Sequence, residues 1–174
     1  MLITGGAGYI GSALVPALIK RGYRVRVIDS LYFGKESLGN VIDQIELVKD
    51  DIRDIKVEQL KRIDAVIHLA GLSNDPMANF APDLNYHVNS EATIRLARLA
   101  KTAGVNRFIF ASSHDSIRTP LCICDHLFSE IIQNISGILL IKNTSSLDII
   151  SFLFGDRWRF LSMAIVFSLL DSVL

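Results

Sequence analysis

Three evenly spaced glycines near the start of the chain, Gly5, Gly8 and Gly11, constrain its fold most strongly. They follow a short apolar run at residues 1–4 that is typical of a strand, and apolar residues then recur at helical spacing over residues 10–19. In such a loop the first glycine permits a tight turn, the second a phosphate close to the backbone, and the third close packing of helix on strand. The segment predicts a strand, a turn and a helix whose N-terminus suits a pyrophosphate.

Short apolar runs alternate with longer stretches as far as residue 117, which is typical of β and α units that build a parallel sheet. The run at 65–71 is apolar enough for a strand buried on both faces, in the middle of the sheet. These patterns predict an α/β fold, a doubly wound parallel sheet of five strands. Beyond the first strand, we expect strands at 23–28, 45–48, 65–71 and 107–113, a crossover between the first two of these, and a helix over 84–103.

The charge of the chain excludes several classes of partner. Among 174 residues, 18 Lys and Arg balance 18 Asp and Glu, so no basic field would draw the protein to nucleic acid or to anionic lipid. Two cysteines cannot build a disulfide framework, and the N-terminal residues lack a basic secretion signal, so we expect a cytoplasmic location.

The end of the chain differs in character from the beginning. Only nine charged residues follow Ile117, in about a third of the chain, and apolar blocks lie at 138–141, 149–154 and 160–170. None reaches the roughly 18 to 20 apolar residues of a membrane span, and we expect short helices or strands. We therefore divide the chain into a domain at 1–117 and a divergent apolar tail at 118–174.

Asp29 strengthens the interpretation of the glycine loop. It lies at the end of the second predicted strand, where a carboxylate can accept hydrogen bonds from a ribose diol and would repel a 2′-phosphate, which favours NAD over NADP. The alternative is a glycine turn that holds no ligand. Six segments can then be compared with known families in their order and spacing: 4–12, 29–30, 51–54, 68–71, 89–93 and 110–113. They resemble the NAD-dependent epimerase/dehydratase family, the extended short-chain dehydrogenase/reductases with a Rossmann-like fold, of which sugar-nucleotide 4-epimerases are best known.

The resemblance implies a set of cofactor-binding residues. They are Gly5, Gly8, Tyr9, Ile10 and Gly11 at the diphosphate, Asp29 and Ser30 at the adenosine ribose, Asp51 and Ile52 at the adenine, Leu69, Ala70 and Gly71 beside the nicotinamide ribose, and Asn89 in the helix that supports the active-site strand. Structural alternatives stay open for three of these groups. Asp51 can be a turn or cap residue, the segment 69–71 can be tight packing at a strand end, and Asn89 can lack a role.

The catalytic pattern of the family is absent from this chain. Members use a Tyr whose pKa is lowered by a Lys four residues later, but none of the four tyrosines has Lys at that spacing. His114 stands where the family has its catalytic Ser or Thr, and we assign no catalytic residue. Cys122, Cys124 and His126 offer three ligands without a fourth, so no metal site is predicted.

We therefore expect an NAD-binding domain of the sugar-nucleotide oxidoreductase or isomerase type, catalytically incomplete and truncated relative to intact members. Those members would bind the nucleotide sugar with a second lobe, which the tail does not resemble. The alternative is a non-enzymatic NAD-binding module, regulatory or interacting, that docks on a partner or on a second copy of itself through the apolar tail.

Overall fold

A computed structural model describes residues 1–72, 80–113, 138–144 and 147–152, with side chains described up to residue 110. Its centre is one sheet of seven strands in the order β3-β2-β1-β4-β5-β6-β7, in which all neighbouring pairs are parallel except the last. The strands are β1 (Leu2–Thr4), β2 (Arg26–Asp29), β3 (Glu46–Lys49), β4 (Ala65–His68), β5 (Arg107–Ser113), β6 (Ile138–Thr144) and β7 (Leu147–Phe152).

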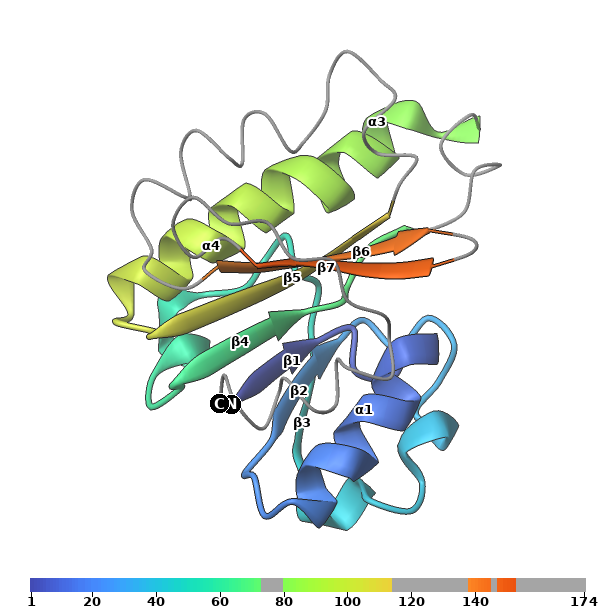
Figure 1. Cartoon of the computed structure of the whole chain (residues 1–174), viewed down its shortest axis with the longest axis vertical. Coiled ribbons are helices and arrows are strands. Elements are labelled where there is room, and N and C mark those ends of the chain that lie inside the picture. Colours follow the sequence, from blue (N-terminus) through green and yellow to red (C-terminus); the bar gives the residue numbers. More distant parts are fainter. Residues whose placement is uncertain (73–79, 114–137, 145–146, 153–174) are drawn as a thin grey trace.

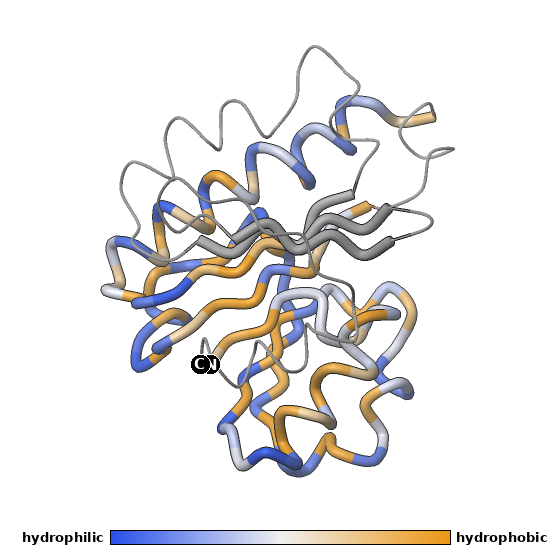
Figure 2. Tube along the Cα trace, in the orientation of Figure 1, coloured by the Kyte–Doolittle hydropathy of each residue, from blue (hydrophilic) through white to orange (hydrophobic). Residues whose placement is uncertain are grey.

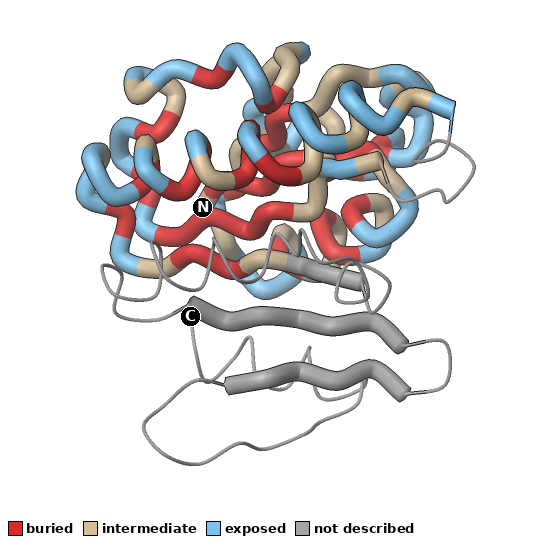
Figure 3. Tube along the Cα trace, turned by 90° about the horizontal axis from the view of Figure 1, so that it is seen from above, coloured by how far each residue is buried: buried red, intermediate tan, exposed pale blue. Residues whose placement is uncertain are grey.

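Helices cover both faces of this sheet (Figure 1). Successive strand residues point to opposite faces, so Leu2, Val66 and Phe108 join one core cluster with α4 (Ala92–Thr102). Their immediate neighbours in sequence pack with α1 (Tyr9–Lys20) in the other cluster. Figure 2 shows the apolar strands between the two layers, and Figure 3 shows that the buried residues gather there. The predicted doubly wound, Rossmann-like fold is confirmed.

The helix after the glycine loop ends where the sequence predicts. The α1 helix stops at Arg21, and Gly22 follows with a φ of +83°. The N–H of Gly22 donates to the Ile19 carbonyl at 2.8 Å and that of Tyr23 to the Leu18 carbonyl at 3.1 Å. These bonds satisfy carbonyls that the end of a helix leaves unpaired.

Two expectations about β2 and β3 need correction. The β2 strand begins at Arg26 rather than at Tyr23, because its partner β1 is only three residues long and Arg26 pairs with Leu2 at the start of that ladder. Between β2 and β3, short 3₁₀ turns at Glu36–Leu38 and Ile42–Gln44 replace the expected helical crossover.

The single helix expected over 84–103 is interrupted. The structure has α3 (Pro82–Tyr86), a π-helical turn at His87–Glu91 and then α4. Within that turn the N–H of Ala92 bonds to the carbonyl of His87, five residues earlier. A turn of this kind is frequent at functional sites because it displaces side chains from the regular helical surface.

Part of the tail joins the sheet. The β6 strand pairs with β5 in parallel from Phe108 to Ser113, and β7 returns antiparallel to β6. The predicted boundary between residues 117 and 118 lies outside the described residues, between the positions of β5 and β6 in the chain. Two apolar blocks that the sequence left as helix or strand form strands, while the block at 160–170 lies outside the described residues.

Within the part of the chain that the structure describes, no helix has the length and hydropathy needed to cross a membrane. The same residues contain no group of three or more His, Cys, Asp or Glu side chains placed to hold a metal. His114 and the Cys122, Cys124 and His126 cluster lie outside the described residues.

Candidate functional site

The glycine loop turns sharply at the end of β1. Gly5 has a φ of +70°, and a Cβ built there would lie 2.6 Å from the backbone nitrogen of Ala70. Its own N–H donates to the Ile28 carbonyl of β2 at 2.9 Å. Gly5 is therefore required twice, by a left-handed backbone and by the close passage of the segment after β4.

The other two glycines differ from each other in what surrounds them. The sequence predicts that Gly11 allows the helix to pack closely on a strand. In the structure a Cβ on Gly11 would lie 2.5 Å from the carbonyl carbon of Gly6, so this glycine packs against the loop itself. Gly8 precedes α1 in extended conformation, and among the described residues a Cβ there would meet only the Gly5 carbonyl oxygen, at 3.2 Å. The fold itself demands glycine at position 8 much less than at positions 5 and 11.

The N-terminus of α1 is open to solvent. Tyr9 is 96% exposed and Ile10 is 44% exposed, and Gly8 provides no side-chain cap. The first turn contains no acidic residue. The partial positive charge of a helix N-terminus therefore has no anionic side chain beside it in that turn, and the N–H groups that a helix start leaves unpaired suit a phosphate.

Asp29, at the end of β2, braces the glycine loop. Its Oδ2 accepts the N–H of Ala7 at 2.9 Å, and its Oδ1 accepts the N–H of Leu31 at 2.7 Å. Leu31 adopts a φ of +56°, uncommon for a non-glycine residue, in making that bond. Because each carboxylate oxygen has about two acceptor sites, the bonds within the described residues leave one site on each oxygen for further donors.

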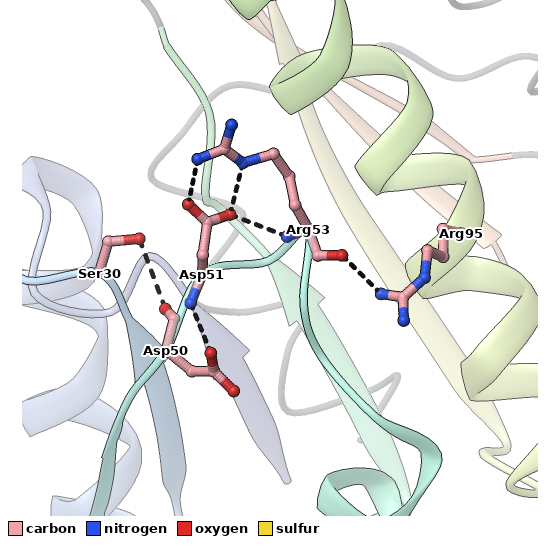
Figure 4. A network of polar contacts seen from close by, with 5 residues as sticks. All are labelled: Ser30, Asp50, Asp51, Arg53 and Arg95. Carbon is pink, nitrogen blue, oxygen red and sulfur yellow. Dashed lines mark hydrogen bonds and ion pairs between the residues drawn. The ribbon is translucent and has the colours of Figure 1, made fainter.

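Asp51 is occupied by its own neighbour (Figure 4). Its Oδ1 accepts the backbone N–H and the Nε–H of Arg53, both at 2.9 Å, and its Oδ2 accepts Nη2 at 2.7 Å. Hydrogen bonds from Arg53 are the main cause that lowers the pKa of Asp51 below its ordinary value. Arg95 bonds to the Arg53 carbonyl at 3.0 Å. These contacts are those of a turn residue, which the sequence analysis gave as the alternative role of Asp51.

Two neighbours of Asp51 have supporting contacts. Ser30 donates weakly, at 3.4 Å, to the carbonyl of Asp50, which ties the end of β2 to the end of β3. Ile52 is 5% exposed and belongs to the core cluster on the α4 face. Both contacts hold the loop after β3 in place beside β2.

The segment after β4 passes between Gly5 and Asn89. Leu69 donates to the Thr4 carbonyl at 3.0 Å, and Ala70 crosses Gly5. A Cβ on Gly71 would lie 3.0 Å from the Oδ1 of Asn89. The tight-packing alternative is thus observed here, and small residues at 70 and 71 keep the segment close to the glycine loop.

Asn89 has a definite role in the structure. Its Oδ1 accepts the N–H of Leu72 at 2.7 Å, and its Nδ2 donates to the Leu72 carbonyl at 2.9 Å. The side chain therefore clamps the backbone that follows Gly71.

The predicted site residues of β1, β2, β3 and β4 follow the ends of these strands. The carboxyl ends of parallel strands meet at one edge of a sheet, and ligands of open α/β sheets bind there. The contacts above link the glycine loop to Asp29 and to the segment 69–71. Sequence reasoning assigned no site role to Ala7, Leu31 or Arg53. Ala7 and Arg53 lie within matching segments, but the contacts of all three with Asp29 and Asp51 follow only from the folded backbone.

Residues 1–117 match the model of the NAD dependent epimerase/dehydratase family. The chain belongs to this family. UDP-glucose 4-epimerase of Klebsiella pneumoniae is 34% identical over 122 residues, which cover 65% of this chain and 88% of that protein. UDP-glucose 4-epimerase 4 of Oryza sativa subsp. japonica is 38% identical over 125 residues, which cover 65% of this chain and 34% of that protein. The chain thus spans about a third of the length of the rice relative.

Solved structures support the same fold. UDP-glucose 4-epimerase of Thermus thermophilus, in complex with NAD, has a TM-score of 0.57 and 33% identity over 64% of this chain and 37% of that chain. The dTDP-glucose 4,6-dehydratase DesIV of Streptomyces venezuelae, with NAD and TYD bound, has a TM-score of 0.59 and 31% identity over 64% and 38%.

A third structure resembles more of the chain. UDP-glucose-4-epimerase of Stenotrophomonas maltophila reaches a TM-score of 0.69 over 81% of this chain and 51% of that chain, at 24% identity. This matched part, 81% of the 174 residues, is longer than the segment 1–117. The likeness, which concerns the fold only, therefore extends into the tail.

Proposed function

We propose that this protein binds NAD at the carboxyl ends of β1 and β2, as the cofactor domain of an epimerase or dehydratase of nucleotide sugars. The observation that carries the proposal is Gly8. Among the described residues, a Cβ added there would meet one atom, the Gly5 carbonyl oxygen at 3.2 Å, at the N-terminus of α1. A diphosphate placed there would accept N–H groups that the helix cannot pair, beside a favourable helix dipole.

Asp29 supports the choice of NAD. Its two backbone bonds hold the carboxylate between the glycine loop and β2, and the remaining acceptor sites can take the two hydroxyls of the adenosine ribose. A 2′-phosphate would bring negative charge against this carboxylate. We infer a preference for NAD over NADP from that repulsion.

The reaction chemistry of this chain is a separate matter. When bound, NAD accepts or returns a hydride, while the protein supplies orientation and proton transfer. The 174 residues contain no Tyr with Lys four positions later. We therefore infer that the chain binds NAD but turns over nucleotide sugars slowly or not at all.

Titration calorimetry of the full chain with NAD and NADP tests the proposal. We expect NAD to bind more tightly than NADP. The Asp29→Asn variant should lose roughly tenfold in NAD affinity, because an amide replaces one charge-assisted acceptor, and should narrow the preference over NADP. Asp43→Asn, at an exposed carboxylate in the 3₁₀ turn before β3, is the control. No NAD binding at millimolar concentration, or equal affinity for both cofactors, contradicts the proposal.

The interaction module remains an alternative function for the tail. Pairing of β6 with β5 and of β7 with β6 makes these two strands of the tail components of the sheet, which favours a structural role for residues 138–144 and 147–152. Sedimentation velocity distinguishes the interaction module from a purely structural tail, since a monomer at all concentrations is inconsistent with docking between copies of the chain.

A further inference from the structure

Three buried polar side chains lie directly beneath the candidate site. Thr4 ends β1, His68 ends β4 and Thr93 stands in the first turn of α4, and each is fully buried. Thr4 and His68 are partners in the parallel register of β1 and β4. The residue after Thr4 is Gly5, and the residues after His68 form the segment that crosses it. These side chains therefore sit where the glycine loop and the end of β4 are fixed relative to each other.

Their hydrogen bonds allow the protons to be assigned. The Thr93 hydroxyl lies 2.8 Å from the carbonyl oxygen of Asn89, which can only accept, so Thr93 donates its single proton there. The Thr93 oxygen must then accept from Nε2 of His68, at 2.8 Å. Nε2 is therefore the protonated nitrogen, and Nδ1 is free to accept the hydroxyl proton of Thr4, at 2.6 Å. Both ring nitrogens are satisfied by a neutral imidazole.

Aromatic side chains provide the remaining described ring contacts of His68. The ring of Phe110 is stacked on it at a centroid distance of 5.5 Å, and that of Phe108 is tilted at 6.1 Å. Burial lowers the pKa of His68 from 6.5 to about 4, and no charged group contributes to that shift. The surroundings thus favour the neutral ring that the hydrogen bonds require.

The same chain of bonds reaches the backbone after β4. Asn89 accepts Thr93 through its carbonyl while its side chain holds both the N–H and the carbonyl of Leu72. The π-helical turn His87–Glu91 contains Asn89. A continuous set of hydrogen bonds therefore runs from the end of β1 to Leu72, by way of two strands and one helix.

We propose that His68 is a positioning residue whose neutral imidazole, protonated at Nε2, locks β1, β4 and the Asn89 turn together. The lock preforms the two stretches of backbone, at Gly5 and at Leu69 to Leu72, that would border the cofactor. This proposal rests on the proposed NAD binding for its consequence, but the lock itself is a property of the protein without ligand. Such preorganisation spares the ordering cost that a ligand otherwise meets when it binds.

Thr93→Val and Thr102→Val form a matched pair of variants. Thr102 also donates to the carbonyl four residues earlier, that of Arg98, at 3.0 Å, but it is exposed and ends α4. Only Thr93→Val removes the acceptor of His68. We expect it to speed hydrogen exchange of the Leu72 amide roughly tenfold and to weaken NAD roughly threefold, while Thr102→Val changes neither.

Substitution of His68 adds a rescue test. The amide oxygen and nitrogen of glutamine are spaced much as the two ring nitrogens are, so His68→Gln can accept from Thr4 and donate to Thr93. We expect it to keep the slow exchange of Leu72, whereas His68→Leu loses it. If His68→Leu fails to fold, the comparison of the two threonine variants still decides.

Long-range nitrogen–proton NMR correlation on the full chain without NAD reads the tautomer directly. We expect one protonated nitrogen, Nε2, at neutral pH. A protonated Nδ1, an imidazolium, or equal Leu72 exchange in Thr93→Val and Thr102→Val overturns the proposal. Failure of the wild-type chain to bind NAD overturns the proposed function instead, since the NMR and exchange measurements do not depend on ligand.

Discussion

Replacing Gly8 by alanine separates the ligand-facing role of the glycine loop from its structural role. Gly8 has a φ of −77°, which alanine adopts without strain, and the added Cβ meets one carbonyl oxygen at 3.2 Å. Alanine caps a helix less well than glycine by roughly 0.5 kcal/mol, while a stiffer unfolded chain returns about 0.4–1 kcal/mol. We expect the free energy of unfolding to change by less than about 1 kcal/mol.

Two other glycines provide reference values for the loss of stability that alanine causes. Gly5 and Gly22 both have positive φ, so alanine costs about 1–2 kcal/mol at either position through left-handed strain. At Gly22 no described residue lies within 4 Å of the added Cβ, so that cost stands alone. At Gly5 the Cβ would lie 2.6 Å from Ala70, and overpacking adds about 1–3 kcal/mol.

Urea unfolding and NAD calorimetry measure the two effects separately. We expect Gly8→Ala to be nearly as stable as wild type but to bind NAD at least roughly tenfold more weakly, because its methyl group stands where the diphosphate would approach. Gly22→Ala should show the reverse, with lower stability and unchanged affinity. Wild-type NAD affinity in Gly8→Ala would refute the reasoning, since it would place the diphosphate elsewhere.

Three further predictions concern pH and the tail. The pKa of His68 is about 4 in the folded chain and 6.5 ordinarily. Between these pH values the unfolded chain therefore binds a proton on His68 that the folded chain does not bind. The free energy of unfolding should therefore fall by about 3 kcal/mol as pH drops from 6.5 to 4, and His68→Gln should flatten that slope in denaturant titrations. For Asp51, stability gained from its lowered pKa is present above the ordinary 3.8 and is lost below it. Arg53→Met should reduce this loss of stability in acid. Denaturant unfolding measured below pH 3.8, a more acidic range than the one in which His68 titrates, tests it. Deletion of residues 118–174 should expose the edge of β5 and cause association, seen as larger species in sedimentation velocity.

Local patterns account for the parts of the fold that depend on neighbours in sequence. The α1 helix, its glycine stop and the buried β4 strand follow from apolar periodicity and from glycine chemistry. The π-helical turn at His87–Glu91 could not be predicted in this way, because the apolar residues there have the spacing of an ordinary helix. Within that turn Asn89 accepts the N–H of Leu72, a partner 17 positions away in the chain that helical spacing does not indicate.

The sequence by itself determined the order of the βα units, the glycine loop and the acidic residue that follows β2, since each is encoded within a short segment. Only the tertiary structure decided what these residues contact. Asp29 braces Ala7, Asp51 is engaged by Arg53, and His68 joins Thr4 to Thr93. The bond from Ala7 to Asp29 spans 22 positions in the chain, and the bonds of His68 to Thr93 and Thr4 span 25 and 64. The physical reason is that parallel strands bring the ends of distant segments to one edge, where buried polar groups must find their partners.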